Sequence, residues 1–392
     1  MPRLVERLWA DDGHHQMVSS RDRGPFTYKA FVPDPIKDLR PDLTSPASSA
    51  VEEAATACAR LDSSPGIDDL ESVARLLLRA ESVASSRIEG LNLSHRRLEE
   101  AGFAPGGAKG MALSIIRNID AMAKAIEIGG RADELALDDL LSIHRTLMHT
   151  ERDRNIAGVV RTEQNWIGGG NTPKRAEFIP PPEDELDDLL EDLIAFCNRD
   201  DLSTVLQAAI AHAQFETIHP FADGNGRTGR CLIHVILRRR GLSTRVVPPV
   251  SVVLAANANS YVRGLTAYRD ERVEEWCVTF ADAMAAAGEQ AIGLGEEFGE
   301  LRESWLVQLG RTQKGSTPSL LIDGLPQHPV LSVESIEERF GVSDEAARKA
   351  IERLVHAGIL RQITVGKRNR AWAAMEVFDL LDEFDLTVRR PG

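Results

Sequence analysis

A run of twelve residues, 219–230, combines residue types that together handle phosphate groups and protons. It reads His-Pro-Phe-Ala-Asp-Gly-Asn-Gly-Arg-Thr-Gly-Arg. His219 is the only residue of the run that can take up and return a proton near neutral pH. Asp223 is a hard oxygen ligand, and Mg²⁺ usually reaches proteins through one or two carboxylates plus substrate phosphates. The run therefore predicts a polyphosphate site with a general base beside it.

The remaining polar residues of the run predict how the phosphates are held. Gly224 and Gly226 lack side chains that would keep a phosphate away from the backbone, and glycine reaches the φ values of a curled anion nest. Asn225 tolerates the same conformation and adds an amide donor. Arg227 and Arg230 are three residues apart, hence on one face of the helix that follows. Two guanidinium groups on one face suit phosphate oxygens.

Two predicted helices must position these residues. The apolar pattern predicts one helix over 204–217, ending before the run, and another over 226–239, beginning inside it. The N-terminus of the second helix offers unpaired backbone N–H groups and a positive dipole end, which together form an anion site. We expect further helices over 70–86, 111–128, 137–149, 183–197, 259–269 and 273–287. Residues 26–35 are expected to be extended and loop-like, because two prolines there block a helix.

At this point the run resembles a known signature. It meets every fixed position of H-x-F-x-[DE]-G-N-G-R-x-x-R, the pattern of Fic-domain (Fic/DOC family) proteins. The resemblance implies a mostly helical fold and transfer of a nucleotide monophosphate, usually AMP from ATP, to a protein hydroxyl. It also implies that His219 deprotonates the target side chain and that Asp223 holds Mg²⁺ on the α- and β-phosphates. Residues 224–226 would cradle the phosphates, with Arg227 and Arg230 contacting them.

A hairpin is predicted upstream of the run. The turn signal Gly168–Asn171 lies between Thr162–Ile167 and Ala176–Ile179. In the family that the chain resembles, a β-hairpin flap pairs with the main chain of the target, so the flap is expected at these residues: Ala176, Glu177, Phe178 and Ile179. Strand addition of this kind gives affinity without strong side-chain selectivity. The alternative is an ordinary surface hairpin.

A second short motif predicts inhibition. Ser85–Gly90 reads Ser-Ser-Arg-Ile-Glu-Gly and matches the family's inhibitory pattern, [ST]-x-x-x-E-[GN]. By that resemblance Glu89, preceded by Ser85, pairs with Arg230 and occupies the arginine that should hold the γ-phosphate. A bidentate, partly buried pair of this type is far stronger than an exposed one. Two alternatives stay open: an ordinary surface glutamate before a glycine cap, or a residue that orients water for removal of AMP.

Two aromatic residues beyond the run are candidates for an adenine pocket. Tyr261 and Trp276 follow the signature at a distance that would let each flank the base. Core packing explains both equally well, because large aromatic side chains dominate protein cores.

The C-terminal residues change character. They predict helices over 332–340 and 344–357, a strand over 359–365, a turn over 366–369 and a strand over 370–373. This order resembles a winged helix-turn-helix. The cations that could meet DNA phosphates are Arg348, Lys349, Arg353, Lys367, Arg368 and Arg370. Nearby glutamates dilute that charge, so protein contact or dimer packing is an equal alternative.

Bulk properties limit the function classes. The 392 residues carry a net charge of −14 with a pI near 5.3, which argues against broad binding to nucleic acid or membrane surfaces. The four cysteines form no CxxC pair, so neither a zinc site nor a disulfide framework is expected, and a reducing cytoplasm fits best. The N-terminal residues lack the apolar core of a signal peptide, and the uncharged run 246–262 is interrupted by prolines and amides.

Together these observations predict a mainly α protein in three parts. They are an N-terminal region with the inhibitory helix (1–110), a Fic-type helical-bundle core with a β-hairpin flap (111–300) and a C-terminal winged helix (312–392). The favoured function is an autoinhibited protein adenylyltransferase that uses ATP and Mg²⁺ to modify a Ser, Thr or Tyr hydroxyl of a target protein, or of itself. The alternatives are transfer of another nucleotide or of phosphate, removal of AMP, and a DNA-binding regulator whose nucleotide site senses. A homodimer is common in the family.

Overall fold

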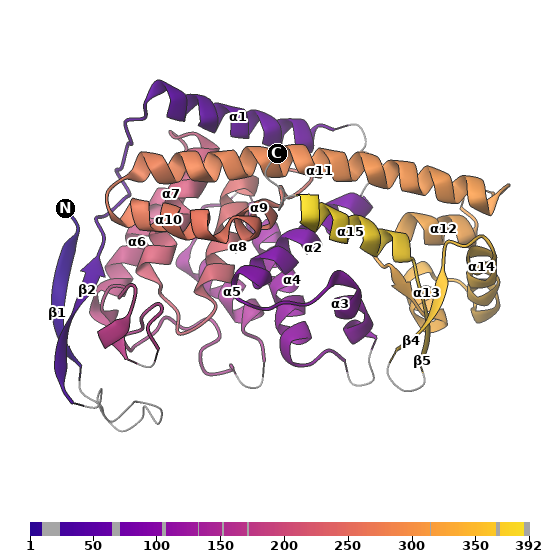
Figure 1. The fold of residues 1–392 in the computed structure, drawn as a ribbon, viewed down its shortest axis with the longest axis horizontal. Coiled ribbons are helices and arrows are strands. Elements are labelled where there is room, and N and C mark those ends of the chain that lie inside the picture. Colours follow the sequence, from indigo (N-terminus) through magenta and orange to yellow (C-terminus); the bar gives the residue numbers. More distant parts are fainter. Residues whose placement is uncertain are drawn as a thin grey trace. The chain divides into compact units, whose positions relative to one another are not determined.

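The computed structural model describes residues 1–9, 24–64, 71–103, 107–131, 133–150, 153–170, 172–313, 315–365 and 369–387. The chain is mainly helical, as predicted (Figure 1). Its contacts separate into two compact units, each assembled from three segments. Unit 1 comprises 1–51, 120–241 and 259–281, and unit 2 comprises 52–119, 242–258 and 282–392. Among the described residues, no helix has both the length and the apolarity that crossing a bilayer requires.

Unit 1 is built on a helix that is buried on all sides. Its helices are α5 (Leu137–Leu147), α6 (Leu186–Cys197), α7 (Thr204–Ile218), α8 (Asn225–Arg239) and α10 (Ala258–Arg269). Every α7 residue from Val205 to Ile218 is buried, including polar residues such as Gln207 and His212, so the helix is covered on all sides. α7 packs on α8 at Gly229, where an added Cβ would lie 2.7 Å from Glu216 Oε1 and 2.8 Å from Phe215 Cδ1. A glycine inside the signature therefore sets the close approach of these two helices.

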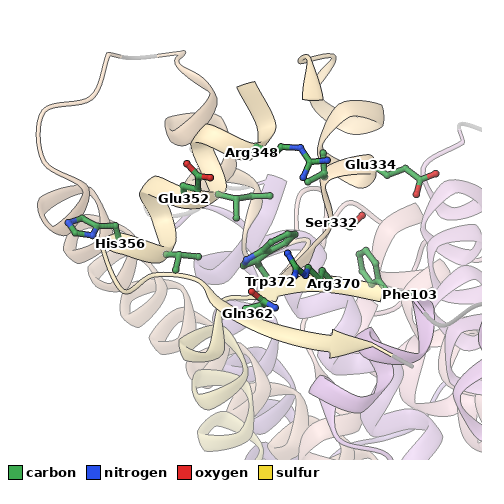
Figure 2. Close-up of a pocket in the computed structure, with 13 residues that line it drawn as sticks. Phe103, Ser332, Glu334, Arg348, Glu352, His356, Gln362, Arg370 and Trp372 are labelled. Atoms are coloured by element: carbon green, nitrogen blue, oxygen red, sulfur yellow. The ribbon is translucent and has the colours of Figure 1, made fainter. Parts of the chain in front are cut away.

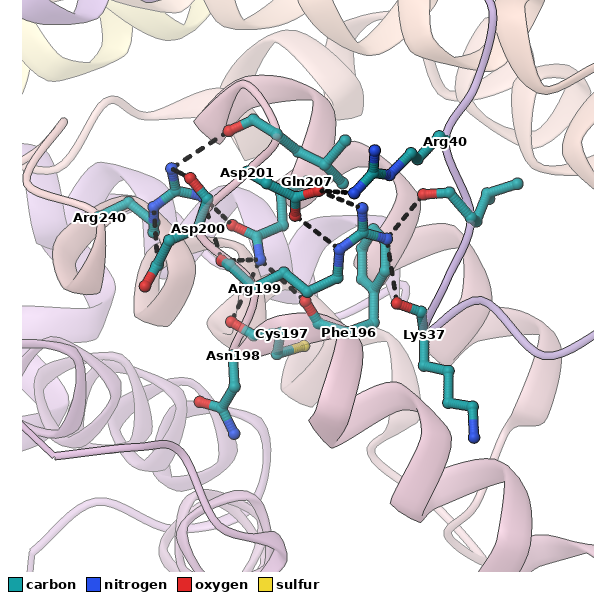
Figure 3. Close-up of polar contacts among 12 residues, drawn as sticks. Lys37, Arg40, Phe196, Cys197, Asn198, Arg199, Asp200, Asp201, Gln207 and Arg240 are labelled. Carbon is teal, nitrogen blue, oxygen red and sulfur yellow. Dashed lines mark hydrogen bonds and ion pairs between the residues drawn. The ribbon is translucent and has the colours of Figure 1, made fainter.

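A ring of polar contacts fixes the register of α6, α7 and α8. The side chain of Gln207, at the start of α7, donates to Phe196 O at 2.9 Å and Arg199 O at 2.8 Å, and accepts from Arg240 Nη1 at 2.7 Å (Figure 3). Arg199 in turn donates to Lys37 O and to a second carbonyl of the N-terminal segment. Because Arg240 directly follows α8, these contacts fix the end of α8 opposite to the signature.

The N-terminal residues form a two-stranded ribbon that the sequence did not predict. β1 (Arg3–Trp9) pairs antiparallel with β2 (Phe26–Val32), with Arg3 opposite Val32 and Trp9 opposite Phe26. The expected loop over 26–35 is therefore a strand up to Val32. Its strand character depends on pairing with β1, which a local pattern does not report.

Three helices have residues in both units: α1 (Ser45–Asp62), α4 (Gly110–Gly129) and α11 (Val273–Leu309). The predicted end of α11 at 287 was wrong, because the helix continues to Leu309. Glycines within it weaken the apolar period, but Gly288 has a packing reason. An added Cβ there would lie 3.0 Å from the backbone of Ala57, so the glycine permits close contact between α11 and α1.

Unit 2 holds the remaining helices and a small sheet. The helices are α2 (Glu71–Ile88), α3 (His95–Gly102), α9 (Val250–Ala256), α12 (Thr317–Gly324), α13 (Val333–Phe340), α14 (Asp344–His356) and α15 (Met375–Thr387). The strands are β3 (Val330–Leu331), β4 (Arg361–Val365) and β5 (Asn369–Ala373), in the order β3-β5-β4. α3, α9, α12, α15 and β3 were not predicted.

The C-terminal elements follow the predicted order of helix, helix, strand and strand, and their assignment as a winged helix stays an interpretation. Ser332 caps α13 as expected, accepting from Ser335 N at 3.1 Å. Most of the predicted turn, residues 366–368, lies outside the described residues and includes the candidate cations Lys367 and Arg368. A cavity of about 960 Å³ opens between the start of α13, one face of α14 and the strands β4 and β5 (Figure 2).

Candidate active site

The signature forms a short loop between two helices, as predicted. His219 ends α7 in the left-handed conformation (φ 50°, ψ 58°), and Gly224 begins α8 with φ 77°. A left-handed conformation costs a non-glycine residue roughly 1–2 kcal/mol, so the surroundings must hold His219 in place. The side chain of His219 is 20% exposed, and its Nδ1 lies 4.0 Å from Glu216 Oε2.

Two side chains outside the signature hold the loop by its carbonyl groups. Arg161 Nε donates to His219 O at 3.0 Å, and Arg161 N donates to Pro220 O at 2.9 Å. Asn165 Nδ2 donates to His219 O at 3.3 Å and to Phe221 O at 3.0 Å. Arg161 is buried, and burial lowers its pKa to about 10, so it remains a cation at neutral pH. The carbonyl groups of residues 219–221 thereby all accept hydrogen bonds from these two residues.

The start of α8 presents backbone N–H groups at the end of the loop. Thr228 N is the first to donate back along the helix, to Gly224 O at 3.0 Å, so the N–H groups of 225–227 precede the first intrahelical hydrogen bond. Asn225 closes the loop, accepting from Phe221 N at 2.8 Å and donating to Phe221 O at 2.8 Å. The amide that was expected as a donor thus donates within the loop and stiffens it, and Asn225 itself does not adopt a positive φ. A role of residue 225 in holding phosphates stays a prediction.

His144 of α5 supports the loop from behind, and the sequence analysis missed it. Gly158 N donates to His144 Nδ1 at 2.9 Å, so Nδ1 is the acceptor nitrogen and Nε2 carries the hydrogen that contacts Asp223 O at 3.0 Å. The ring stacks on Phe221 with centroids 3.7 Å apart and 6° between the planes. Burial lowers the pKa of His144 to about 4, so it is neutral at physiological pH. Its only sequence signal was a histidine on the apolar face of the helix predicted over 137–149.

The charged residues of the signature differ in burial. The arginines are almost fully buried, Arg230 at 1% and Arg227 at 7% exposure. The carboxylate of Asp223 is 67% exposed and lies 3.8 Å from Arg227 Nη2. Among the described residues, no three His, Cys, Asp or Glu side chains gather as a metal cluster. A magnesium ion would fit here only with Asp223 as a protein ligand and phosphate or water oxygens as the others, which is its usual mode of binding.

The predicted flap is a single bridge rather than a two-stranded hairpin. Ile167 N donates to Phe178 O at 2.8 Å, and Glu177 N donates to Ile167 O at 2.8 Å. The short 3₁₀ helix η2 (Pro173–Arg175) and the positive φ values of 168–170 stop the ladder from extending. Residues Ala176 and Glu177 follow η2 directly, and Glu177 is exposed. Asn171 lies outside the described residues.

Phe178 and Ile179, at the C-terminal end of the flap segment, contact other elements of unit 1. Phe31 N of β2 donates to Ile179 O at 2.9 Å, and the rings of Phe31 and Phe178 lie 5.7 Å apart. The guanidinium of Arg269 covers the Phe178 ring at 3.8 Å. β2, which was not predicted, therefore supports the flap segment.

The two adenine-pocket candidates lie in the core of unit 1. Trp276 is 0% exposed, and its Nε1 donates to Ala209 O at 2.8 Å. Tyr261 is 4% exposed, with its hydroxyl 2.8 Å from His212 Nε2. These contacts favour the packing alternative for both residues, because each polar atom is engaged with α7.

The inhibitory motif ends α2 at a glycine cap. Glu89 is the first residue after the helix and is exposed, whereas Ser85 is fully buried. Gly90 has φ 78°, and Leu91 N donates back to Ser86 O at 3.0 Å. The cap is compatible with Glu89 as an inhibitory residue and with Glu89 as an ordinary surface glutamate. Its pairing with Arg230, which belongs to the other unit, stays a prediction.

A cavity of about 490 Å³ adjoins the signature loop. It is lined by Ala222 and by residues 155–156 and 159–166. Apolar side chains contribute to its wall, and Val159 is 49% exposed. The loop thus has a recess of mixed polarity beside it, on the same chain segment that leads into the flap.

Comparisons with known proteins agree with this geometry. Residues 134–237 match the model of the Fic/DOC family, and the signature lies within the match. The chain is 33% identical over 132 residues to protein adenylyltransferase fic-1 of Caenorhabditis elegans, covering 33% of this chain and 23% of that protein. It is 34% identical over 143 residues to protein adenylyltransferase Fic of Culex quinquefasciatus, covering 35% of this chain and 26% of that protein. The chain therefore spans about a quarter of the length of the curated relatives it matches.

Solved structures share the fold. A Fic family protein from Desulfovibrio desulfuricans superposes with a TM-score of 0.53 at 22% identity, covering 86% of this chain and 98% of that one. Fic-1 of C. elegans gives a TM-score of 0.50 at 21% identity, covering 64% of this chain and 74% of that one. At these identities the similarity supports the fold alone.

Proposed function

Because residues 134–237 are a Fic/DOC domain, we propose that this protein transfers AMP from ATP to a hydroxyl group of a target protein. The observation that carries the proposal is the signature loop. His219 lies at the start of the loop, and the backbone N–H groups of residues 225–227 lie at its end. The carbonyl groups of residues 219–221 are hydrogen-bonded to Arg161 and Asn165. The names of the relatives, protein adenylyltransferases, support the same reaction.

His219 and the start of α8 divide the chemistry between them. His219 accepts the proton of the target hydroxyl as its oxygen attacks the α-phosphorus, and pyrophosphate leaves with the electron pair of the broken P–O bond. The N–H groups of 225–227, with Arg227 and Arg230, balance the charge that develops on the phosphate oxygens. Asp223 would hold Mg²⁺, which supplies further neutralisation of the phosphates. Since the loop is fixed before substrate binds, little reorganisation is needed at the moment of reaction.

The target segment would lie along the flap. Residues 176–179 pair with Ile167 through a single bridge, and Ile179 O accepts from Phe31 N, so a target strand would add to the segment between these contacts. The recess beside Ala222 would take a side chain next to the modified residue. Its exposed Val159 favours an apolar neighbour.

We further propose that Glu89 inhibits the reaction by pairing with Arg230, as the inhibitory motif of the family implies. Glu89 follows a helix end whose geometry is fixed by the Gly90 cap. The same carboxylate could orient water for removal of AMP, and the sequence motif fits both roles.

Intact-mass spectrometry tests the proposal. Wild type, Glu89→Gly and His219→Ala are incubated with each nucleoside triphosphate and with a mixture of cellular proteins. We expect Glu89→Gly to gain the mass of AMP, or to add it to a target, with ATP only. We expect AMP transfer by His219→Ala to fall by about 100-fold or more, because a general base usually contributes that much to the rate. Equal modification by His219→Ala, or addition of phosphate instead of AMP, would contradict the proposed reaction.

For the C-terminal module, the charges favour protein contact over DNA binding. Arg348 pairs with Asp344 at 2.6 Å, and Lys349 pairs with Glu345 at 2.7 Å, all on α14. Cations already paired on their own helix gain less from phosphates. A gel-shift assay at low salt checks this inference, and a salt-dependent shift would favour the DNA-binding alternative.

A further inference from the structure

A buried charged cluster joins the end of α2 to the C-terminal helix α15. Asp385 of α15 accepts a hydrogen bond from Arg87 Nη2 at 2.5 Å, and the same oxygen lies 3.3 Å from His95 Nε2 of α3. The side chains are 8% exposed for Asp385, 1% for His95 and 18% for Arg87. All three residues belong to unit 2. The cluster therefore ties three helices together at one point.

The electrostatics of the cluster keep Asp385 ionised. Burial raises the pKa of Asp385, but hydrogen bonds from His95 and Arg87 outweigh it, so its pKa is lowered overall. Removing one partner of a buried pair leaves the other charge uncompensated. The contact is thus specific to a carboxylate at this position.

Apolar packing sets the place of Asp385. Phe378, earlier on α15, belongs to a buried cluster with Val330, Ala371 and Ala373, and Phe103 at the end of α3 packs against it. Phe103 also lines the cavity shown in Figure 2. α15 is therefore attached to α3 through the contact between Asp385 and His95, and both helices pack on the apolar cluster around Phe378.

The cluster acts on the segment that carries Glu89. Arg87 lies in the last turn of α2, two residues before Glu89. Its carbonyl accepts from Gly90 N at 3.0 Å, so Arg87 is part of the cap that sets the path of 89–91. Glu89 directly follows the helix, so the path of the backbone at the end of α2 sets where its carboxylate can reach. The contacts of Arg87 are one part of what sets that path.

We propose that Asp385 is a positioning residue for Glu89, so that full inhibition requires the C-terminal helix. This proposal rests on the inhibitory role of Glu89 proposed above. α15 holds Arg87, Arg87 holds the end of α2, and the end of α2 aims Glu89. Any event that moves α15 would then release the enzyme.

Four proteins test the proposal: wild type, Asp385→Asn, Glu89→Gly and the double variant. Incorporation of labelled AMP is measured well below each melting temperature. We expect Asp385→Asn to raise basal incorporation about fivefold or more, the low end of coupling between sites. In the Glu89→Gly background the same change should have no effect. A merely destabilising change would instead lower activity in both backgrounds.

A matched control and a second variant complete the experiment. Glu383→Gln removes the same charge from the same helix at an exposed position, and it should behave as wild type. If Asp385→Asn fails to fold, Arg87→Gln breaks the same contact from the less buried side and should activate equally.

The outcomes separate the two proposals. If Glu89→Gly itself does not activate, the inhibitory role fails. If Glu89→Gly activates but Asp385→Asn and Arg87→Gln do not, Asp385 has no positioning role while the inhibitory role stands. Further activation in the double variant would also overturn the proposal, because Asp385 would then act by another route.

Discussion

The signature loop and the segment proposed to inhibit it are held in different ways. Loop 219–224 is anchored through several carbonyl groups by His144 of α5 and by Arg161 and Asn165 of a second segment, all in unit 1. Segment 86–91 of unit 2 contains the exposed Glu89, and its charged anchor is the cluster around Asp385.

The difference matches the role that we propose for each region. A site that stabilises a transition state works best when its groups are fixed in advance, since misplacement by about an ångström can cost on the order of a hundredfold in rate. An inhibitory segment must be displaced during activation, so it belongs to the less firmly held parts of a protein. Redundant anchors suit the first role, and few anchors suit the second.

The largest expected effect comes from Gly224→Ala. Gly224 has φ 77°, and an added Cβ would lie 3.0 Å from Met148 Sδ and 3.1 Å from Leu147 Cδ2. Relief of this strain must move the loop, so we expect AMP transfer in the Glu89→Gly background to fall about 100-fold. Gly241→Ala is the control, because Gly241 has a similar φ of 71° with open space around its Cβ position. Equal activity of both variants in a radiolabel assay would show that the loop tolerates displacement.

A smaller effect is expected from His144. His144→Phe keeps a ring to stack on Phe221 but loses the donor to Asp223 O, so we expect kcat/KM to fall about tenfold, or about 1.4 kcal/mol of transition-state stabilisation.

His144→Gln keeps an N–H that can reach the same carbonyl and should restore most of the activity of wild type. Steady-state kinetics with varied ATP make the comparison. Full activity of His144→Phe together with a loss in His144→Gln would mean that His144 supports the loop by packing alone.

The smallest effect is expected at the other region. Asn118 Nδ2 donates to Ser82 O at 2.7 Å and to Ser86 Oγ at 3.1 Å, which gives the end of α2 a second anchor. Asn118→Leu should loosen this end and raise basal AMP transfer about twofold, since each such hydrogen bond contributes only about 1 kcal/mol. Activation larger than that of Asp385→Asn in the same assay would make Asn118, rather than the charged cluster, the main anchor.

Local signals predicted much of the fold and part of the site. The helices of unit 1 were found within a few residues, because their apolar periods are strong. The flap was wrong as a two-stranded hairpin, since Pro173 and three left-handed glycines stop the ladder. The contacts of the Asn225 side chain were not predicted, because its partner, the Phe221 backbone, becomes available only in the folded loop.

The sequence by itself determined the chemistry of the signature. A histidine, an acid, glycines and arginines at fixed spacing in one loop and one helix turn need only local backbone geometry to converge. Only the tertiary structure decided which residues hold the signature loop and the end of α2. Asp223 meets His144 from 79 residues away, and Arg87 meets Asp385 from 298 residues away. Such pairs carry no periodic signal, because their proximity is set by the packing of whole helices and not by neighbouring residues in the chain.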